Sequence, residues 1–127
     1  MGVRKMLIEI TSFGHKYGQP ETDIMLDMRC LENPYWVPAL RELSGLDMPV
    51  QEYILQDKDS AAYLQTVLTL MTMQAKLAAR RGCERLQIAV GCTGGRHRSV
   101  TAAVLLAGHL RKEGYTVNLH HRDIERG

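Results

Sequence analysis

The stretch "IAVGCTGGRHRSV", residues 88–100, decides the fold of this chain. Its first residues belong to an apolar, β-branched run that predicts a buried strand over about 85–91. From Ser99 to Lys112, apolar residues recur every three or four positions, which predicts a helix. A glycine-rich turn between a buried strand and a helix is typical of α/β proteins, where such turns lie at the carboxyl edge of an open sheet.

The remaining segments supply three more strands and a long helix. Their apolar patterns predict strands at 6–11, 23–31 and 115–121 and a helix at 60–80. Asp59 or Ser60 is the expected N-cap of this helix. The sequence therefore predicts a single α/β domain over residues 1–127, with a small open, mostly parallel sheet of about four strands, flanking helices and a phosphate-binding strand–loop–helix.

The bulk composition is ordinary for a globular domain and argues against several classes of protein. Of the 127 residues, 45% are hydrophobic and 24% are charged, and the formal net charge is +2. No apolar run approaches the roughly 18 residues of a membrane span, and the N-terminus lacks a signal-peptide pattern, so we expect a cytoplasmic protein without a membrane partner. Three cysteines without CxxC spacing argue against a disulfide framework and a structural zinc site.

The loop between the predicted strand and helix has the composition of an anion-binding nest. Gly94 and Gly95 allow positive φ and let backbone N–H groups converge, while the following helix adds its N-terminal donors. Arg98 can hold two phosphate oxygens at once, and Thr93 and Ser99 supply hydroxyl groups. The loop is therefore predicted to bind a phosphate group.

The same loop also matches the pattern of an enzyme. Cys92, Gly95 and Arg98 reproduce the Cys-x-x-Gly-x-x-Arg spacing of cysteine-dependent phosphatases, in which the loop stabilises a nucleophilic thiolate. Asp27 or Asp47 would then protonate the leaving group. The sequence favours a binding domain over an enzyme and leaves this phosphatase as the alternative.

Other polar side chains are expected near the same sheet edge. Asp27 and Arg29, at the end of the second predicted strand, are spaced to lie on one face and would complete the wall of the site. His97 is a candidate ligand contact within the loop itself. His15 and Lys16 follow the first strand in a glycine-flanked loop and are further candidates at this edge.

Four stretches together resemble a known family, the C-terminal domain of the RNase adapter protein RapZ and its nucleotide-binding relatives. In order along the chain, these stretches are "SFGHKYGQP" (12–20), "LDMRCLENPYWVPALRELSGLDMPV" (26–50), "AVGCTGGRHRSV" (89–100) and "HHRD" (120–123). The resemblance runs from about Ile8 to Asp123. The family usually carries a P-loop ATPase domain before this region. Because the chain has no Gly-x-x-x-x-Gly-Lys-Ser/Thr segment, ATP or GTP hydrolysis is not expected of it.

The resemblance implies a regulatory domain that binds a sugar phosphate, associated in RapZ with glucosamine-6-phosphate sensing. Together with the residues discussed above, the predicted ligand-binding set is Cys92, Thr93, Gly94, Gly95, Arg96, His97, Arg98, Ser99, Asn33, Tyr35, Asp27 and Arg29. The segment from Asn33 to Trp36 is implied to border the sugar. No cofactor and no metal ion are implied.

RNA is a second expected partner. The resemblance implies small-RNA binding, and basic residues gather in the last third of the chain, where they would neutralise several phosphates. The expected RNA-binding residues are Arg111, Lys112, Arg122 and Arg126, of which the last two belong to what reads as a polar tail at 122–127. A homo-oligomer and a separate ATPase subunit are left open as further partners.

Overall fold

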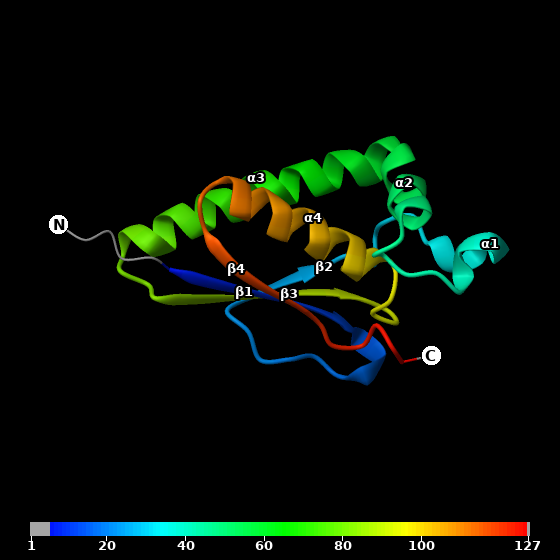
Figure 1. The fold of residues 1–127 in the computed structure, drawn as a ribbon, viewed down its shortest axis with the longest axis horizontal. Coiled ribbons are helices and arrows are strands. Elements are labelled where there is room, and N and C mark those ends of the chain that lie inside the picture. Colours follow the sequence, from blue (N-terminus) through cyan, green and yellow to red (C-terminus); the bar gives the residue numbers. More distant parts are fainter. Residues whose placement is uncertain (1–5, 127) are drawn as a thin grey trace.

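The computed structural model describes residues 6–126, which form a four-stranded sheet with helices packed on it (Figure 1). In chain order the elements are β1 (Leu7–Gly14), the 3-10 turn η1 (His15–Tyr17), β2 (Ile24–Asp27), the 3-10 turn η2 (Pro34–Trp36), α1 (Pro38–Arg41), α2 (Met48–Gln56), α3 (Lys58–Arg80), β3 (Arg85–Cys92), α4 (Arg98–Lys112) and β4 (Thr116–His121). The predicted α/β class is confirmed.

The sheet has the strand order β2-β3-β1-β4, and every neighbouring pair is parallel. The prediction of a mostly parallel sheet of about four strands is therefore confirmed. The two central strands end in register, with Phe13 opposite Gly91 and Gly14 opposite Cys92. Because all four strands run the same way, their carboxyl ends meet at one edge, together with α1 and the start of α4 (Figure 1).

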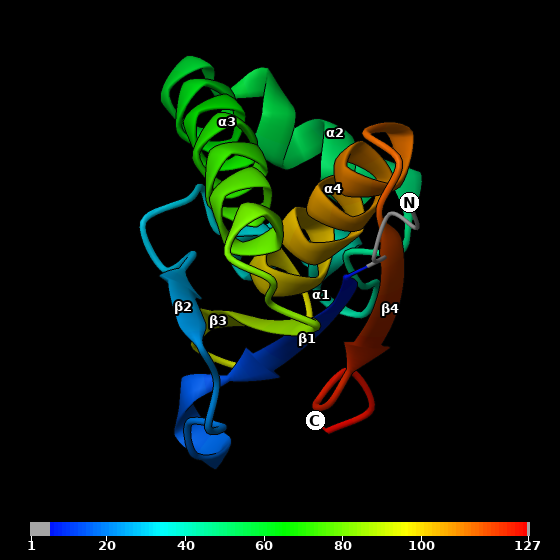
Figure 2. The ribbon, with the colours of Figure 1, turned by 90° about the vertical axis from the view of Figure 1, so that its left-hand side faces the viewer.

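The helices α2, α3 and α4 all lie on one face of the sheet, as Figures 1 and 2 show from two directions. The opposite face carries the segment 15–23, which runs below the sheet without forming an α-helix. Alternate residues of the central strands point toward the helices and are fully buried, among them Ile8, Ile10, Ile88 and Val90. The hydrophobic core therefore lies between the sheet and one helical layer.

Two helices differ in detail from their predicted form. Helix α3 begins at Lys58 because the side chain of Asp57 accepts a hydrogen bond from the Ser60 backbone N–H at 2.9 Å, so the predicted N-cap was wrong. Helix α4 is buried over a broader surface than one apolar stripe, since it packs against both the sheet and α3. Leu106 is consequently buried, although the periodic pattern did not single it out.

The C-terminal turn corrects the expectation of a polar tail. After β4 the chain turns back over the sheet edge, and the side chain of Asp123 is completely buried. Residue 127 of the expected tail lies outside the described residues. Within residues 6–126, no helix is both long and apolar enough to cross a membrane.

Candidate functional site

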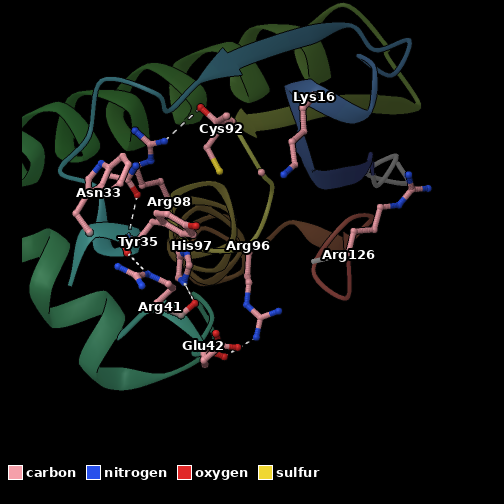
Figure 3. A pocket seen from close by; sticks show the side chains of 13 residues that line it. Lys16, Asn33, Tyr35, Arg41, Glu42, Cys92, Arg96, His97, Arg98 and Arg126 are labelled. Atoms are coloured by element: carbon pink, nitrogen blue, oxygen red, sulfur yellow. Dashed lines mark hydrogen bonds between the residues drawn. The ribbon is translucent and has the colours of Figure 1, made fainter. Parts of the chain in front are cut away.

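A pocket of about 540 Å³ opens at the carboxyl edge of the sheet, in front of the N-terminus of α4 (Figure 3). Eight of the predicted ligand-binding residues line it: Asn33, Tyr35, Cys92, Thr93, Gly94, Arg96, His97 and Arg98. The other four, Gly95, Ser99, Asp27 and Arg29, do not line it. The remaining lining residues are Lys16, Trp36, Arg41, Glu42 and Arg126. The structure thus brings the loop and the segment after residue 33 together, as the resemblance implied.

The two loop glycines have different roles. Gly95 has φ of +79°, whereas Gly94 does not adopt a positive φ, so the prediction that both turn in this way holds for one of them only. A Cβ on Gly95 would lie 2.5 Å from the Gly14 nitrogen, but a Cβ on Gly94 would meet no atom within 4 Å. The turn therefore requires glycine at position 95, where the loop packs against the end of β1.

Cys92 is buried at the end of β3, with 3% of its surface exposed. Its Sγ donates a hydrogen bond to the Ser99 Oγ at 3.2 Å and accepts one from the Gly95 N–H at 3.3 Å. Ser99 is completely buried and supports the thiol rather than the pocket. The Cys92 side chain therefore ties the start of the loop to the start of α4.

Arg98 is the most buried cation of the site, with 7% of its surface exposed. Its Nη1 donates to the backbone carbonyls of Arg29 at 2.7 Å and Leu31 at 3.4 Å, and its Nη2 lies 3.5 Å from the Thr93 Oγ1. Within residues 6–126, no carboxylate lies within ion-pair distance of this guanidinium. A buried charge held only by neutral acceptors favours an anion nearby.

Two further arginines of the pocket are held in the same way. Arg96 donates from Nε to the Leu43 carbonyl at 3.0 Å and from Nη2 to the Glu42 carbonyl. Arg41 donates from Nε to the Tyr35 carbonyl at 2.9 Å, and its guanidinium lies over the Tyr35 ring. In the described part of the chain neither pairs with a carboxylate, so positive charge accumulates around the pocket.

His97 serves as a neutral hydrogen-bond donor at the base of the pocket. Its Nε2 lies 3.1 Å from the carbonyl oxygen of Arg41, which can only accept, so Nε2 carries the proton. Burial lowers the pKa of this imidazole, and hydrogen bonds to backbone carbonyls only partly oppose that effect. His97 therefore adds no charge at neutral pH and instead fixes α1 against the loop.

One wall of the pocket, beside Arg98, is built from the 3-10 turn η2 (Figure 3). The side chain of Asn33 caps this turn by accepting a hydrogen bond from the Tyr35 N–H at 3.1 Å. Tyr35 and Trp36 meet edge to face and remain exposed, Trp36 by 71% of its surface. Two exposed aromatic side chains therefore line the pocket beside a group of cations.

Asp27 and Arg29 form a pair outside the pocket. Strand β2 ends at Asp27, so the expectation that both residues lie on one face of a strand was wrong. The Arg29 side chain instead folds back onto the Asp27 carboxylate, with Nη2 2.8 Å from Oδ2. The backbone carbonyl of Arg29 is what reaches the site, as an acceptor for Arg98.

This pairing also removes the expected general acid of a phosphatase. The hydrogen bond from Arg29 holds the pKa of Asp27 at about 2, so the carboxyl is ionised at neutral pH and has no proton to give. Asp47 accepts a hydrogen bond from the Ser44 backbone N–H and does not line the pocket. Glu42, which does line it, lies at the opposite end from Cys92 (Figure 3).

The last wall consists of residues that sequence reasoning only partly found. Lys16, a candidate from its place after β1, reaches the pocket from the turn η1, and its backbone N–H bonds to the Thr93 carbonyl at 3.2 Å. Arg126, expected to bind RNA, reaches it from the C-terminal turn. Arg41 carried no sequence signal beyond its charge, because its place depends on how α1 packs.

The four residues expected to bind RNA lie in two separate pairs, Arg111 with Lys112 and Arg122 with Arg126. Arg111 and Lys112 end α4, roughly 20 Å along the helix from its start at the pocket, given a rise of about 1.5 Å per residue. Arg122 is half-buried and donates to the carbonyls of Tyr17 and Gly18.

Among residues 6–126, no group of three or more His, Cys, Asp or Glu side chains is placed to hold a metal ion.

Comparison with known proteins places this chain in a family. The profile of the RapZ C-terminal domain matches residues 6–125. A nucleotide-binding protein of Rhodospirillum centenum is 48% identical over 118 residues, which are 92% of this chain and 36% of the relative. A nucleotide-binding protein of Nitratidesulfovibrio vulgaris is 44% identical over 98% of this chain and 43% of the relative. One of Limosilactobacillus reuteri is 43% identical over 94% of this chain and 41% of the relative. The chain spans less than half the length of these relatives, and it belongs to the RapZ C-terminal domain family.

Proposed function

We propose that the pocket binds a phosphorylated small molecule, with the phosphate at the loop and the N-terminus of α4. The observation that carries this proposal is Arg98, a buried guanidinium whose described partners are carbonyl and hydroxyl oxygens. A dianionic phosphate would supply the missing countercharge, and the first backbone N–H groups of α4 would add donors. Arg96 and Arg41 extend the positive field across the pocket.

The rest of the pocket fits a sugar attached to that phosphate. Its volume of about 540 Å³ lies within the usual range for small-molecule sites, roughly 300–1,000 Å³. Asn33 and Glu42 offer polar groups to hydroxyl or amino substituents, and the exposed rings of Tyr35 and Trp36 offer an apolar face. A sugar phosphate is therefore the ligand class that uses both ends of the pocket.

The relatives' names attribute nucleotide binding to proteins of which this chain covers 36–43%. A nucleotide also carries a phosphate ester and is a fair competitor for the same loop. We place sugar phosphates first because the pocket combines its two exposed aromatic side chains with an amide and a carboxylate. We regard the domain as a binding and regulatory module rather than a phosphatase, because neither carboxyl group expected to act as general acid lines the pocket.

Phosphorus NMR of the purified chain with glucosamine 6-phosphate tests binding and catalysis in one experiment. We expect the ligand resonance to shift or broaden with added protein, with no inorganic phosphate appearing over time. Glucosamine without phosphate should not compete, and adenosine monophosphate should compete more weakly. Arg98→Gln should abolish the shift, while Arg85→Gln, an exposed arginine at the start of β3, should leave it unchanged.

Two results would contradict the proposal. An unchanged ligand resonance at millimolar protein would mean that the cationic pocket does not bind a phosphate ester. Growth of an inorganic phosphate signal that disappears in Cys92→Ser would instead establish the phosphatase alternative. Stronger competition by adenosine monophosphate would keep the phosphate site but replace the sugar with a nucleotide.

A further inference from the structure

The C-terminal turn is organised around one buried carboxylate. Asp123 has no exposed surface, yet its side chain contacts three donors from two parts of the chain. Its Oδ2 accepts the Gly14 backbone N–H at 2.7 Å, and the guanidinium groups of Arg122 and Arg126 lie at 2.8 Å and 3.2 Å from its oxygens. Such a carboxylate fixes the groups around it, because moving any one of them would leave a buried charge with fewer partners.

This carboxylate stands where the phosphate loop, β1 and the C-terminal turn converge. A Cβ on Gly95 would lie 3.0 Å from the Cβ of Asp123, so the loop packs directly on it. Gly14, which donates to Asp123, precedes the turn η1 that carries Lys16. One buried residue therefore contacts or adjoins each segment that forms this side of the pocket.

Arg126 is the part of the turn that faces the ligand space. It lines the pocket together with Lys16, and Figure 3 places the two on the side away from Asn33 and Tyr35. Its side chain is 55% exposed, but it is held between the Asp123 carboxylate and the ring of Tyr17, 4.8 Å from the ring centroid. An exposed arginine with two fixed contacts loses little side-chain entropy when an anion binds.

We propose that Arg126 is a ligand contact of the anion site and that Asp123 is the residue that positions it. The inference rests on the proposed function, because it names a second cationic wall for the same ligand. It gives the buried carboxylate a role that simple electrostatics would not: a negative charge beside an anion site should weaken binding, whereas a positioning residue should strengthen it. The sign of the effect of removing that charge distinguishes the two roles.

Isothermal titration with glucosamine 6-phosphate across a double-mutant cycle tests this assignment. Asp123→Asn keeps an oxygen for the Gly14 N–H but removes the charge that holds Arg126. We expect Arg126→Gln and Asp123→Asn each to weaken binding about 5- to 10-fold, in line with one charge-assisted hydrogen bond. The double variant should be no more than about twofold weaker than either single variant. Arg85→Gln, which breaks the exposed pair with Glu9, is the matched control and should bind normally.

Arg126→Lys keeps the positioning claim testable if Asp123→Asn does not fold. Lysine retains the charge but not the planar fork, so we expect it to restore less than half of the affinity lost in Arg126→Gln. Full restoration by lysine, tighter binding by Asp123→Asn, or losses that multiply in the double variant would each overturn the positioning role. Wild-type affinity in Arg126→Gln would overturn the whole inference while leaving the proposed function intact. In these titrations the proposed function itself fails if the wild-type chain does not bind.

Discussion

Arg98 and Arg126 line the same pocket, and they are held in opposite ways. Arg98 is 7% exposed and donates to two backbone carbonyls, with no carboxylate near it in the described residues. The side chain of Arg126 is 55% exposed and ion-paired with the buried Asp123. The first arginine leaves positive charge uncompensated inside the protein, whereas the second already shares a carboxylate with Arg122 before any ligand arrives.

The contrast assigns the two arginines different effects on an anion: the charge of Arg98 would attract it, and the fixed side chain of Arg126 would position it. We call residues 92–98 the loop side of the pocket, and Lys16 with residues 122–126 the tail side. On the loop side, a buried unpaired cation makes the empty pocket costly and rewards an anion that enters. On the tail side, the carboxylate lowers the net field but keeps a flexible side chain in one place. In the proposed binding function, the loop side would set the affinity for the anion and the tail side would set its position.

The largest expected effect comes from substituting Gly95, where the loop packs against Gly14 and Asp123. Gly95→Ala places a side chain at φ of +79° and within 2.5 Å of the Gly14 nitrogen, so we expect a loss of about 3 kcal/mol or more in the free energy of unfolding. Gly94→Ala, with no atom within 4 Å of its Cβ, should change it by less than about 1 kcal/mol. Urea unfolding of both variants measures the difference, and equal losses would contradict the assigned roles.

The next effect separates the two arginines through ligand-induced stabilisation. At ten times the dissociation constant, inorganic phosphate or a phosphate ester should stabilise the wild-type fold by about 1.4 kcal/mol, or roughly 5 °C in Tm. Arg98→Gln should abolish this shift, and Arg126→Gln should retain part of it, because the loop side supplies the uncompensated charge. Differential scanning fluorimetry over a phosphate titration measures both. An equal loss in the two variants would mean that the pocket does not divide in this way.

Titratable groups on the two sides of the pocket should also change the stability of the fold at different pH values. Burial lowers the pKa of His97 below 6.5, and the same direction holds for His15 and His121. The unfolded chain therefore takes up protons first, and stability should fall as pH drops below about 6.5. Burial alone would raise the pKa of Asp123, but the hydrogen bond from Arg122 and the nearby charges bring it below 3.8. The ionised Asp123 carboxylate therefore stops stabilising the fold only as the pH falls below that value.

Substitutions test which residue causes each part of the pH dependence of stability, His97 on the loop side or Asp123 on the tail side. His97→Gln should flatten the decline between pH 6.5 and 5 by up to about 1.4 kcal/mol per pH unit, leaving the smaller decline due to the other histidines. Asp123→Asn should flatten the profile only below about pH 4. Urea unfolding from pH 8 to pH 3 gives both slopes. A His97→Gln profile parallel to the wild type would show that this imidazole is protonated in the folded state.

The contrast also explains what the sequence alone could predict. The loop side is one contiguous stretch, so local rules for glycine turns, helix N-termini and arginine identify Thr93, Gly94 and Arg98 as lining residues without knowledge of the fold. Strand and helix types followed from periodicity, and the parallel sheet followed from their alternation. The error at Arg29 arose because the period of a strand was extended past Asp27, where the backbone turns.

The tail side depends on strand order, which no local pattern encodes. Asp123 and its donor Gly14 are separated by 109 residues and meet only because β4 lies beside β1. A carboxylate in a charged C-terminal segment is normally exposed, so its burial could not be read from "RDIERG". Lys16 was a candidate from its place after the first strand, but Arg126 reaches the same pocket only through the strand order, and Arg41 only through the packing of α1.

The smallest expected effect is that of substituting Arg29, whose backbone carbonyl contacts Arg98 on the loop side. Arg29 touches the site through its backbone carbonyl, which accepts from Arg98 at 2.7 Å, while its side chain pairs with Asp27 in solvent. Arg29→Ala keeps that carbonyl, so affinity for a phosphate ester should change by less than about twofold and stability by less than about 1 kcal/mol. Isothermal titration beside Arg98→Gln measures it. A tenfold loss in Arg29→Ala would mean that the exposed guanidinium itself binds the anion, and uncompensated charge on Arg98 would no longer explain why the loop side attracts it.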